Sequence, residues 1–320
     1  MPRFVSRLLN RGVSNDPRFA MPVGRIAEVR SADGTRLHVE VYGPEDGFPI
    51  VLSHGISLAL RVWVRQIGAL SNEFRVIAYD QRGHGRSEVA PVGAYSIGTL
   101  ADDLEAVLTA TLRDGERAVI AGYSLGGISV AAWSERYPGS VQTRAAAAVL
   151  INTAVGDLVR ETRLFAMPAR LADGRVRLAR TLGRFMHVPI PTPVLRATPA
   201  ITGTIVGPGA NYADIVFMHE MLVSTSALAR AEYLQTALRL GRRYIDVANL
   251  TVPTVVIGGK WDPLTPIVHS RRLVELLPNP LELIELEGGH SAPLAHSDVV
   301  TCNIRALANA ACENRGQSAL

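Results

Sequence analysis

The chain has 320 residues, of which 48% are hydrophobic, and a formal net charge of +4. This length and this hydrophobic fraction allow a large buried core, as one α/β domain or as two. Lys260 is the only lysine, so arginine supplies almost all the positive charge, and no lysine-rich run or stacking-aromatic pattern supports nucleic-acid binding. No apolar run approaches the ~18 residues of a membrane-spanning helix. These features predict a soluble, cytoplasmic globular protein with no nucleic-acid partner.

Residues 1–24 are interpreted as a separate N-terminal arm. Four arginines alternate there with apolar residues, and acidic residues are few. This amphipathic pattern favours a frayed arm or a helix that lies on the protein's own surface, and the less favoured alternatives are a membrane-surface contact through residues 1–20 and an organellar presequence. At the other end of the chain, Cys302 and Cys312 are interpreted as thiols in a reducing compartment rather than a disulfide or a metal pair.

Strands and helices follow the arm in a regular order. The turn signal Asp33-Gly34 separates two predicted strands at 25–30 and 36–42, which form an antiparallel hairpin. From residue 49, strands at 49–53, 75–79, 118–121 and 145–151 alternate with helices at 63–70, 100–112 and 125–137, and two more strands are predicted at 254–258 and 281–286. Such alternation implies parallel strands joined by right-handed crossovers. The chain is therefore predicted to form an α/β fold with a mostly parallel eight-stranded sheet and helices on both faces.

The strand signal disappears between Asp157 and Asp246, where helical stretches are broken by prolines and by Gly207-Pro208-Gly209. We interpret 157–246 as a helical cap inserted into a core of 25–156 and 247–313, with 314–320 as a tail. The apolar residues of this cap are expected to pack on the core, and only a few of them to line a pocket for a hydrophobic substrate. They are Phe165, Met167, Phe185, Met186, Ile190, Phe217, Met218, Met221 and Leu222. The seven arginines from Arg160 to Arg184 are interpreted as a solvated face, with attraction of an anionic group as the alternative.

The clearest chemical signal is Gly122-Tyr123-Ser124-Leu125-Gly126, which follows an apolar strand and precedes a helical pattern. A strand that turns this tightly into a helix leaves no space for side chains two residues before and after the serine, so glycine is required at both positions. The sequence therefore predicts an activated serine at the turn.

Two later strands end in possible partners of this serine. The strand at 254–258 leads into Asp262, and the strand at 281–286 leads into His290. Because the carboxyl ends of parallel strands meet at one edge of a sheet, these two side chains and Ser124 are expected to converge there. Asp157, which follows the strand at 145–151, is an alternative acid, and His296 is interpreted as a residue at a helix start.

Two more segments complete the pattern: His54-Gly55-Ile56-Ser57 after the third strand and Asp80-Gln81-Arg82-Gly83-His84-Gly85-Arg86-Ser87 after the fourth. Together with the serine turn and the strand-end Asp and His, they resemble the α/β-hydrolase superfamily over residues 25 to about 311. The resemblance is to the lid-containing type, which includes serine esterases, carbon–carbon bond hydrolases, cofactor-free haloperoxidases and epoxide hydrolases. Serine at the turn argues against epoxide hydrolases and haloalkane dehalogenases, which carry a carboxylate there, and against dienelactone-hydrolase-like thiol chemistry.

The resemblance implies roles for particular residues. Ser124 is the expected nucleophile, His290 its base and Asp262 the acid that orients the base. The backbone N–H groups of Ile56 and Leu125 are expected to form an oxyanion hole. The residues proposed to contact substrate are Trp63, Tyr123, Phe217 and Met218. His54 and His84 are interpreted as hydrogen-bond partners of the loop backbone, and Asp80 and Arg82 as residues that lock their own turn.

The predicted function is hydrolysis of a carboxylic ester with a small to medium hydrophobic acyl or alcohol part, through an acyl-enzyme intermediate. No metal-ligand spacing, phosphate-binding loop or nicotinamide fingerprint is present, so no cofactor and no metal are implied. The alternatives are hydrolysis of a C–C bond in a ring-cleavage product, cofactor-free perhydrolysis, and ligand binding without catalysis. The expected partner is a small-molecule substrate, and the sequence leaves the oligomeric state open.

Overall fold

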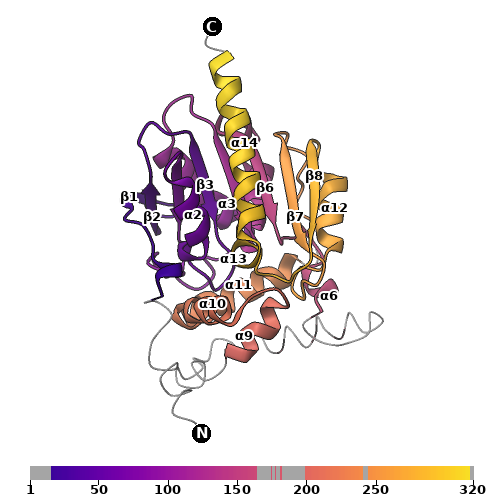
Figure 1. Ribbon diagram of the computed structural model, residues 1–320. Helices are drawn as coiled ribbons and strands as arrows, with labels where there is room; N and C mark the ends of the chain where they lie inside the picture. The colour runs from indigo at the N-terminus through magenta and orange to yellow at the C-terminus, as the bar shows by residue number, and fades with distance from the viewer. Residues whose placement is uncertain are drawn as a thin grey trace.

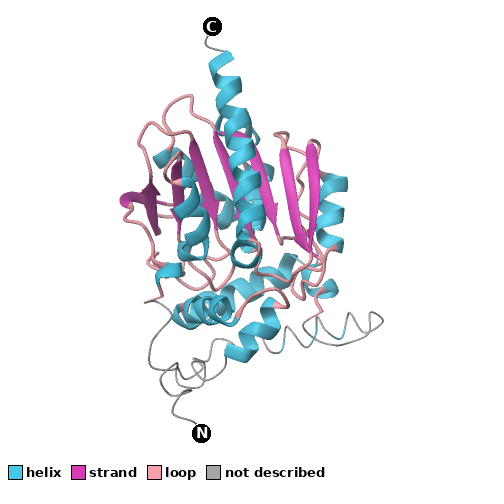
Figure 2. Cartoon of the chain, in the orientation of Figure 1, coloured by secondary structure: helices cyan, strands magenta, loops and turns pink. Residues whose placement is uncertain are grey.

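The computed structural model describes residues 16–163, 174, 177, 181, 199–240 and 244–317. At its centre is an eight-stranded sheet with the strand order β1-β2-β4-β3-β5-β6-β7-β8, seen in magenta in Figure 2. The strands are β1 (Arg25–Arg30), β2 (Arg36–Tyr42), β3 (Pro49–Ser53), β4 (Arg75–Tyr79), β5 (Ala118–Tyr123), β6 (Ala145–Ile151), β7 (Thr254–Gly259) and β8 (Pro280–Leu286). β2 pairs antiparallel with β1 and β4, and the other neighbours are parallel. The predicted fold class is confirmed.

Apolar side chains cover both faces of the sheet because successive strand residues point to opposite sides. In β3, Ile50 and Leu52 join one apolar layer, together with residues of α2 (Val64–Leu70) and α14 (Ser297–Gln317). Val51 joins the other layer, together with residues of α3 (Ile97–Thr111) and α4 (Leu125–Arg136). Figure 1 shows α14 crossing the near face of the sheet. Shorter helices complete the core: η3 (Leu60–Trp63), α5 (Pro138–Arg144), α12 (Val268–Leu276) and α13 (Ala292–Ala295).

The loop after β4 is held by two buried charged residues. Asp80 accepts hydrogen bonds from the backbone N–H groups of Leu60 at 2.7 Å and Arg86 at 2.9 Å, so it locks its own turn as predicted. Arg82 does more than the sequence suggested, because its fully buried guanidinium reaches Asp103 on α3 at 2.6 Å and Asp33 in the β1–β2 turn at 2.7 Å. The strand-end loop is thereby tied to the hairpin and to a helix.

Four described helices lie between β6 and β7, and we call them the inserted helices. They are α6 (Leu158–Glu161), α9 (Pro199–Val206), α10 (Tyr212–Ser224) and α11 (Ala227–Leu240). Figure 1 places α9, α10 and α11 beyond one end of the sheet. The division into a core of 25–156 and 247–313 and a cap of 157–246 stays a prediction. Of the apolar residues predicted to belong to the cap, Phe165, Met167, Phe185, Met186 and Ile190 lie outside the described residues, as do most of the arginines from 160 to 184.

The described part of the N-terminal arm packs against the protein. Phe19, in η2 (Pro17–Phe19), is 1% exposed, and its ring stacks on Phe217 of α10 with the centroids 4.2 Å apart. The guanidinium groups of Arg61 and Arg65 lie 5.1 Å and 5.9 Å from the Phe217 and Phe19 ring centroids. This segment therefore anchors an inserted helix, and residues 1–15 lie outside the described part of the chain. None of the described helices has both the length and the apolar character required to cross a membrane.

Candidate active site

Ser124 occupies the turn between β5 and α4 in a conformation that L-residues rarely adopt, with φ 54° and ψ −116°. The backbones around it are in close contact. A Cβ atom at Gly122 would lie 2.5 Å from the carbonyl oxygen of Gly126, and one at Gly126 would lie 2.1 Å from that of Ser53. Both distances are too short for any side chain. The steric reason predicted for glycine is confirmed at Gly122, where the clash lies within the turn, whereas at Gly126 the clash is with the end of β3.

Ser124, His290 and Asp262 form a continuous hydrogen-bonded chain. His290 Nε2 lies 2.9 Å from Ser124 Oγ, and His290 Nδ1 lies 2.6 Å from Asp262 Oδ2. The three residues are 8%, 4% and 0% exposed. An ionised carboxylate only accepts hydrogen bonds, so Nδ1 carries the imidazole proton and Nε2 is left as an acceptor facing the serine hydroxyl. A hydroxyl, an imidazole and a carboxylate in contact in this order have the geometry that a nucleophile, its base and an orienting group require.

The Asp262 carboxylate is held from several sides. Its Oδ1 accepts hydrogen bonds from the N–H groups of Leu264 at 2.8 Å and Thr265 at 2.9 Å. Its Oδ2 accepts from Thr265 Oγ1 at 2.8 Å and from Asn152 Nδ2 at 2.7 Å, besides its contact with His290. These donors fix the plane of the carboxylate and therefore the orientation of the imidazole.

Sequence reasoning missed Asn152 and Thr265. Asn152 directly follows β6, is fully buried and has φ 44°, a left-handed conformation that asparagine tolerates better than most residues. Its place at a strand's carboxyl end was the available signal. The alternative acid, Asp157, lies at the start of α6, where its carboxylate accepts a hydrogen bond from the Tyr244 hydroxyl. The structure therefore places Asp262, and not Asp157, beside the imidazole of His290.

The two predicted oxyanion donors lie on segments that flank Ser124. Leu125 is the first residue of α4, where a helix leaves its N–H groups without intrahelical acceptors. Ile56 belongs to the loop after β3, and a Cβ atom at Gly55 in that loop would lie 3.1 Å from Ser124 Cβ. Within the described part of the chain, neither the Ile56 nor the Leu125 N–H donates a hydrogen bond to the protein. Both donors are thus free to bind a ligand oxygen.

Two buried histidines hold the loops next to these donors. Ser57 donates its N–H to His84 Nε2 at 2.9 Å, and Gln81 donates its N–H to His54 Nε2 at 2.9 Å. Burial lowers the pKa of His84 to about 4, while burial and the nearby His84 lower the pKa of His54 to about 3. Both rings are therefore neutral acceptors at neutral pH, as their predicted role as partners of the loop backbone requires.

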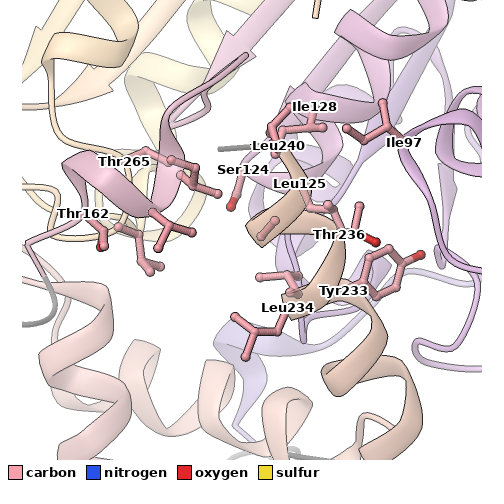
Figure 3. A pocket seen from close by; sticks show the side chains of 15 residues that line it. Ile97, Ser124, Leu125, Ile128, Thr162, Tyr233, Leu234, Thr236, Leu240 and Thr265 are labelled. Carbon is pink, nitrogen blue, oxygen red and sulfur yellow. The ribbon is translucent and has the colours of Figure 1, made fainter. Parts of the chain in front are cut away.

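An apolar cleft opens beside Ser124 (Figure 3). It encloses about 910 Å³, part of it open to solvent, and carbon atoms make up almost all of its surface. The lining residues come from the core loops, α3, α4, α6 and α11: Ile56, Ile97, Ser124, Leu125, Ile128, Leu158, Val159, Thr162, Tyr233, Leu234, Thr236, Ala237, Leu240, Leu264 and Thr265. None of these residues is charged, so the described lining offers no ion pair to an anionic substrate.

The polar side chains of the cleft direct their hydroxyl groups to protein acceptors. Thr162 Oγ1 donates to the carbonyl oxygen of Pro263 at 2.9 Å, and Thr236 Oγ1 donates to that of Tyr95 at 3.1 Å. The Tyr233 hydroxyl donates to the carbonyl oxygen of Arg82 at 3.3 Å. These residues therefore contribute mainly carbon atoms to the cleft surface.

The four residues proposed to contact substrate do not line this cleft, and that part of the prediction is corrected. Trp63 is fully buried, with its ring edge-on to Tyr123 at a centroid distance of 6.3 Å. The Tyr123 hydroxyl donates to the carbonyl oxygen of His290. Phe217 and Met218 lie on α10 in the apolar layer of α2 and α14. The inserted helices that wall the cleft are α6 and α11, so the packing of the helices, and not their apolar composition alone, decides which of them face the serine.

Comparisons with known proteins identify the family of this chain. A family model described as alpha/beta hydrolase fold matches residues 49–297. A non-heme chloroperoxidase of Streptomyces lividans is 31% identical over 289 residues, which cover 87% of this chain and 98% of that protein. A putative carbamate hydrolase of Variovorax paradoxus is 31% identical over 264 residues, which cover 82% and 92%. The solved structure of an esterase from a Rhodococcus species superposes with a TM-score of 0.71 at 25% identity and covers 89% of this chain and 98% of that one.

The family model spans most of the chain, and two relatives exceed 30% identity over more than four-fifths of it. The matched segment, residues 49–297, includes β3 to β8 and the sharply turned serine after β5, which has the strand-turn-helix setting of that fold. The chain belongs to the α/β-hydrolase family.

Proposed function

We propose that the protein is a serine hydrolase that cleaves a carboxylic ester with a small to medium hydrophobic acyl or alcohol part. The observation that carries this proposal is the chain of hydrogen bonds from Asp262 through His290 to Ser124, which ends at an apolar cleft. A nucleophile, a base and an adjacent hydrophobic surface are what ester hydrolysis requires from a protein.

In the proposed mechanism, neutral His290 takes the hydroxyl proton of Ser124 as the serine oxygen attacks the ester carbonyl carbon. The imidazolium is stabilised by the Asp262 carboxylate at 2.6 Å. Collapse of the tetrahedral intermediate breaks the bond to the alcohol oxygen, and His290 returns the proton to that oxygen. Water, activated by the same imidazole, then attacks the acyl-enzyme and releases the carboxylic acid and the free serine.

The free N–H groups of Ile56 and Leu125 are the proposed oxyanion donors. Negative charge develops on the carbonyl oxygen in the transition state, and one such donor is typically worth about 3 kcal/mol. The loop that carries Ile56 is fixed by the hydrogen bond from Ser57 to His84, so its donor is held in place before substrate binds. This preorganisation supports the assignment.

The inserted helices are proposed to form a cap over the site. The cleft is lined by two residues of α6, by Thr162, which directly follows α6, and by five residues of α11. The residues of the two helices are Leu158, Val159, Tyr233, Leu234, Thr236, Ala237 and Leu240. A substrate group in the cleft would therefore lie between the core and these two segments. Because the described walls are apolar and uncharged, an unbranched acyl chain or a ring is the expected occupant.

Hydrolysis of p-nitrophenyl esters from acetate to palmitate tests the proposal. Wild type is expected to hydrolyse at least one ester, and Ser124→Ala to lose a factor of roughly a thousand or more in kcat. Ser140→Ala, on α5 away from the cleft, is the matched control and should behave as wild type. Equal activity in wild type and Ser124→Ala would exclude Ser124 as the nucleophile, and no turnover by folded wild type would exclude the ester proposal.

Perhydrolysis is a second candidate function, favoured by the names of two relatives. One is the chloroperoxidase already described, and another is a bifunctional esterase/perhydrolase of Acinetobacter calcoaceticus, 28% identical over 288 residues. In this reaction hydrogen peroxide replaces water as the nucleophile that attacks the acyl-enzyme, and the products are a peroxycarboxylic acid and the free serine. Assaying peracid formation from an ester and hydrogen peroxide, with Ser124→Ala as the blank, distinguishes the two activities.

A further inference from the structure

The backbone of His290 and its neighbour is bound to the inserted helices. His290 donates its N–H to the carbonyl oxygen of Val206 at 2.5 Å, and Gly289 donates its N–H to the carbonyl oxygen of Pro208 at 2.7 Å. Val206 ends α9, and we call residues Val206 to Pro208 the α9–α10 turn. Two main-chain hydrogen bonds therefore connect the histidine loop to a segment inserted between β6 and β7.

The bond to Val206 is one of five hydrogen-bonding contacts of His290 in the described part of the chain. The imidazole contacts Asp262, Ser124 and Thr265, and the carbonyl oxygen accepts a hydrogen bond from the Tyr123 hydroxyl. These four partners belong to the core. The N–H group makes the fifth contact, and its acceptor, Val206, is the one of the five that belongs to the inserted helices.

The α9–α10 turn also fits closely between the loops that carry the acid and the histidine. Gly207 has φ 75°, and a Cβ atom there would lie 3.0 Å from Pro263 Cδ, 3.2 Å from the Trp261 oxygen and 3.3 Å from Gly289 Cα. From the other side, a Cβ atom at Gly289 would lie 2.3 Å from the Val206 oxygen. Trp261 and Pro263 flank Asp262 in sequence and Gly289 precedes His290, so this one turn contacts the neighbours of both residues.

A second contact holds α10 against the same loop. Arg65 of α2 donates one N–H to Asp214 of α10 at 2.6 Å and another to the carbonyl oxygen of Leu294 in α13. The short helix α13 begins two residues after His290. The α9–α10 part of the inserted helices is therefore attached to the histidine loop at two separate places.

The cleft is walled by a different part of the inserted helices. Its described lining includes residues of α6 and α11 but none of α9, α10 or the turn between them. The insertion is thus divided: α6 and α11 face the substrate space, whereas the α9–α10 turn supports the loop that carries the base.

We propose that the α9–α10 turn is a positioning element for His290, so that the base is correctly placed only while α9 and α10 are seated on the core. This inference rests on the proposed function, in which His290 acts as the base. The turn holds the backbone of the loop while Asp262 holds the ring.

Gly207→Ala and Gly209→Ala form a matched pair that tests the proposal. Both glycines have positive φ, 75° and 101°, so alanine strains the backbone at both positions, and more at Gly209, which lies farther from the left-handed region that L-residues can adopt. A Cβ atom at Gly207 presses on the two loops, whereas one at Gly209 comes no closer than 3.4 Å to any atom, an ordinary contact. In Gly207→Ala, kcat for a p-nitrophenyl ester is expected to fall at least tenfold while KM stays within twofold. The rate at which a fluorophosphonate labels Ser124 is expected to fall by a similar factor. Gly209→Ala is expected to keep wild-type values.

Amide hydrogen exchange of the wild-type protein provides a second measurement, which is independent of turnover. The N–H groups of Gly289 and His290 are expected to exchange slowly and with the same opening free energy as the N–H of Gly207, which is bonded within α9. Fast exchange of the first two would overturn the inference even if Gly207→Ala does not fold. Full kcat in Gly207→Ala, or an equal loss in Gly209→Ala, would also overturn it. An inactive wild type with slow, matched exchange would instead count against the proposed function alone.

Discussion

Asn152 Nδ2 lies 2.7 Å from Asp262 Oδ2, the same oxygen that accepts a hydrogen bond from His290 Nδ1 at 2.6 Å. The amide also donates to the carbonyl oxygen of Gly289 at 3.2 Å, so one side chain joins the acid to the residue that precedes the base. Asn152 is fully buried, so removing its amide leaves a buried oxygen of Asp262 with one hydrogen-bond donor fewer. It is a positioning residue for the proposed triad.

Replacing Asn152 is expected to lower kcat by about tenfold while KM stays within twofold, because the amide contacts Asp262 and not the cleft. Asn152→Gly and Asn152→Ala should be compared, since glycine accepts the φ of 44° whereas alanine adds backbone strain of about 1 kcal/mol. kcat should fall in both variants. In urea unfolding, Asn152→Ala should be less stable than Asn152→Gly by the free energy of this backbone strain. Wild-type kcat in Asn152→Gly would show that the amide does not position Asp262.

Stability is expected to fall as the pH drops from 6.5 toward 4. The pKa of buried His84 is lowered to about 4 from an ordinary value of 6.5, so the unfolded chain binds this proton first. The contribution of neutral His84 to the free energy of unfolding is therefore complete above pH 6.5. It is lost as the pH falls from 6.5 to about 4, at up to about 1.4 kcal/mol per pH unit. His54 adds a loss in the same direction.

Urea unfolding of wild type and His84→Gln between pH 7.5 and 4.5 measures this effect. Glutamine retains an oxygen acceptor for the Ser57 N–H but has no proton to gain in this range. The free energy of unfolding should therefore depend less on pH in the variant. An identical pH dependence in the two proteins would contradict the assignment of the titration to His84.

Ala237 offers a way to shorten the cleft, because it lies on α11 among the lining residues. Ala237→Leu is expected to raise KM for long-chain p-nitrophenyl esters by about tenfold, the effect of roughly 1.4 kcal/mol of lost contact, and to leave acetate nearly unchanged. The matched control is Ala200→Leu, at an exposed position on α9. A KM profile that does not change with chain length would exclude the cleft as the acyl site.

Phe19 is expected to contribute strongly to stability although it lies in the N-terminal arm. Its ring is buried against Phe217, and Phe→Ala substitutions at such sites typically cost about 3 to 5 kcal/mol. Val23 is fully exposed in the same segment, so Val23→Ala should change the free energy of unfolding by less than about 0.5 kcal/mol. Equal unfolding midpoints for the two variants would show that the arm does not anchor α10.

The features that were predictable from sequence are those with local causes. The bounds of the strands follow from short apolar runs and turn residues, and the hairpin at Asp33-Gly34 follows from turn chemistry. The turn at Ser124 was predictable because its glycine pattern is a local motif, and the steric requirement for Gly122 acts within five residues, whereas the requirement for Gly126 comes from the end of β3. The order of serine, acid and histidine, each after a strand, placed the three side chains at one edge because parallel strands end there.

The tertiary structure alone decided how distant segments meet. α10 and α11 both carry apolar residues, and only their packing shows that Ala237 faces the cleft while Phe217 contacts Phe19. The bond from His290 to Val206 joins two main-chain groups, and backbone groups are the same in every residue, so no sequence pattern marks it. Asn152 reaches Asp262 across 110 positions of sequence. Local sterics and periodicity thus determine the elements and the serine turn, and long-range packing determines what holds the base and what walls the cleft.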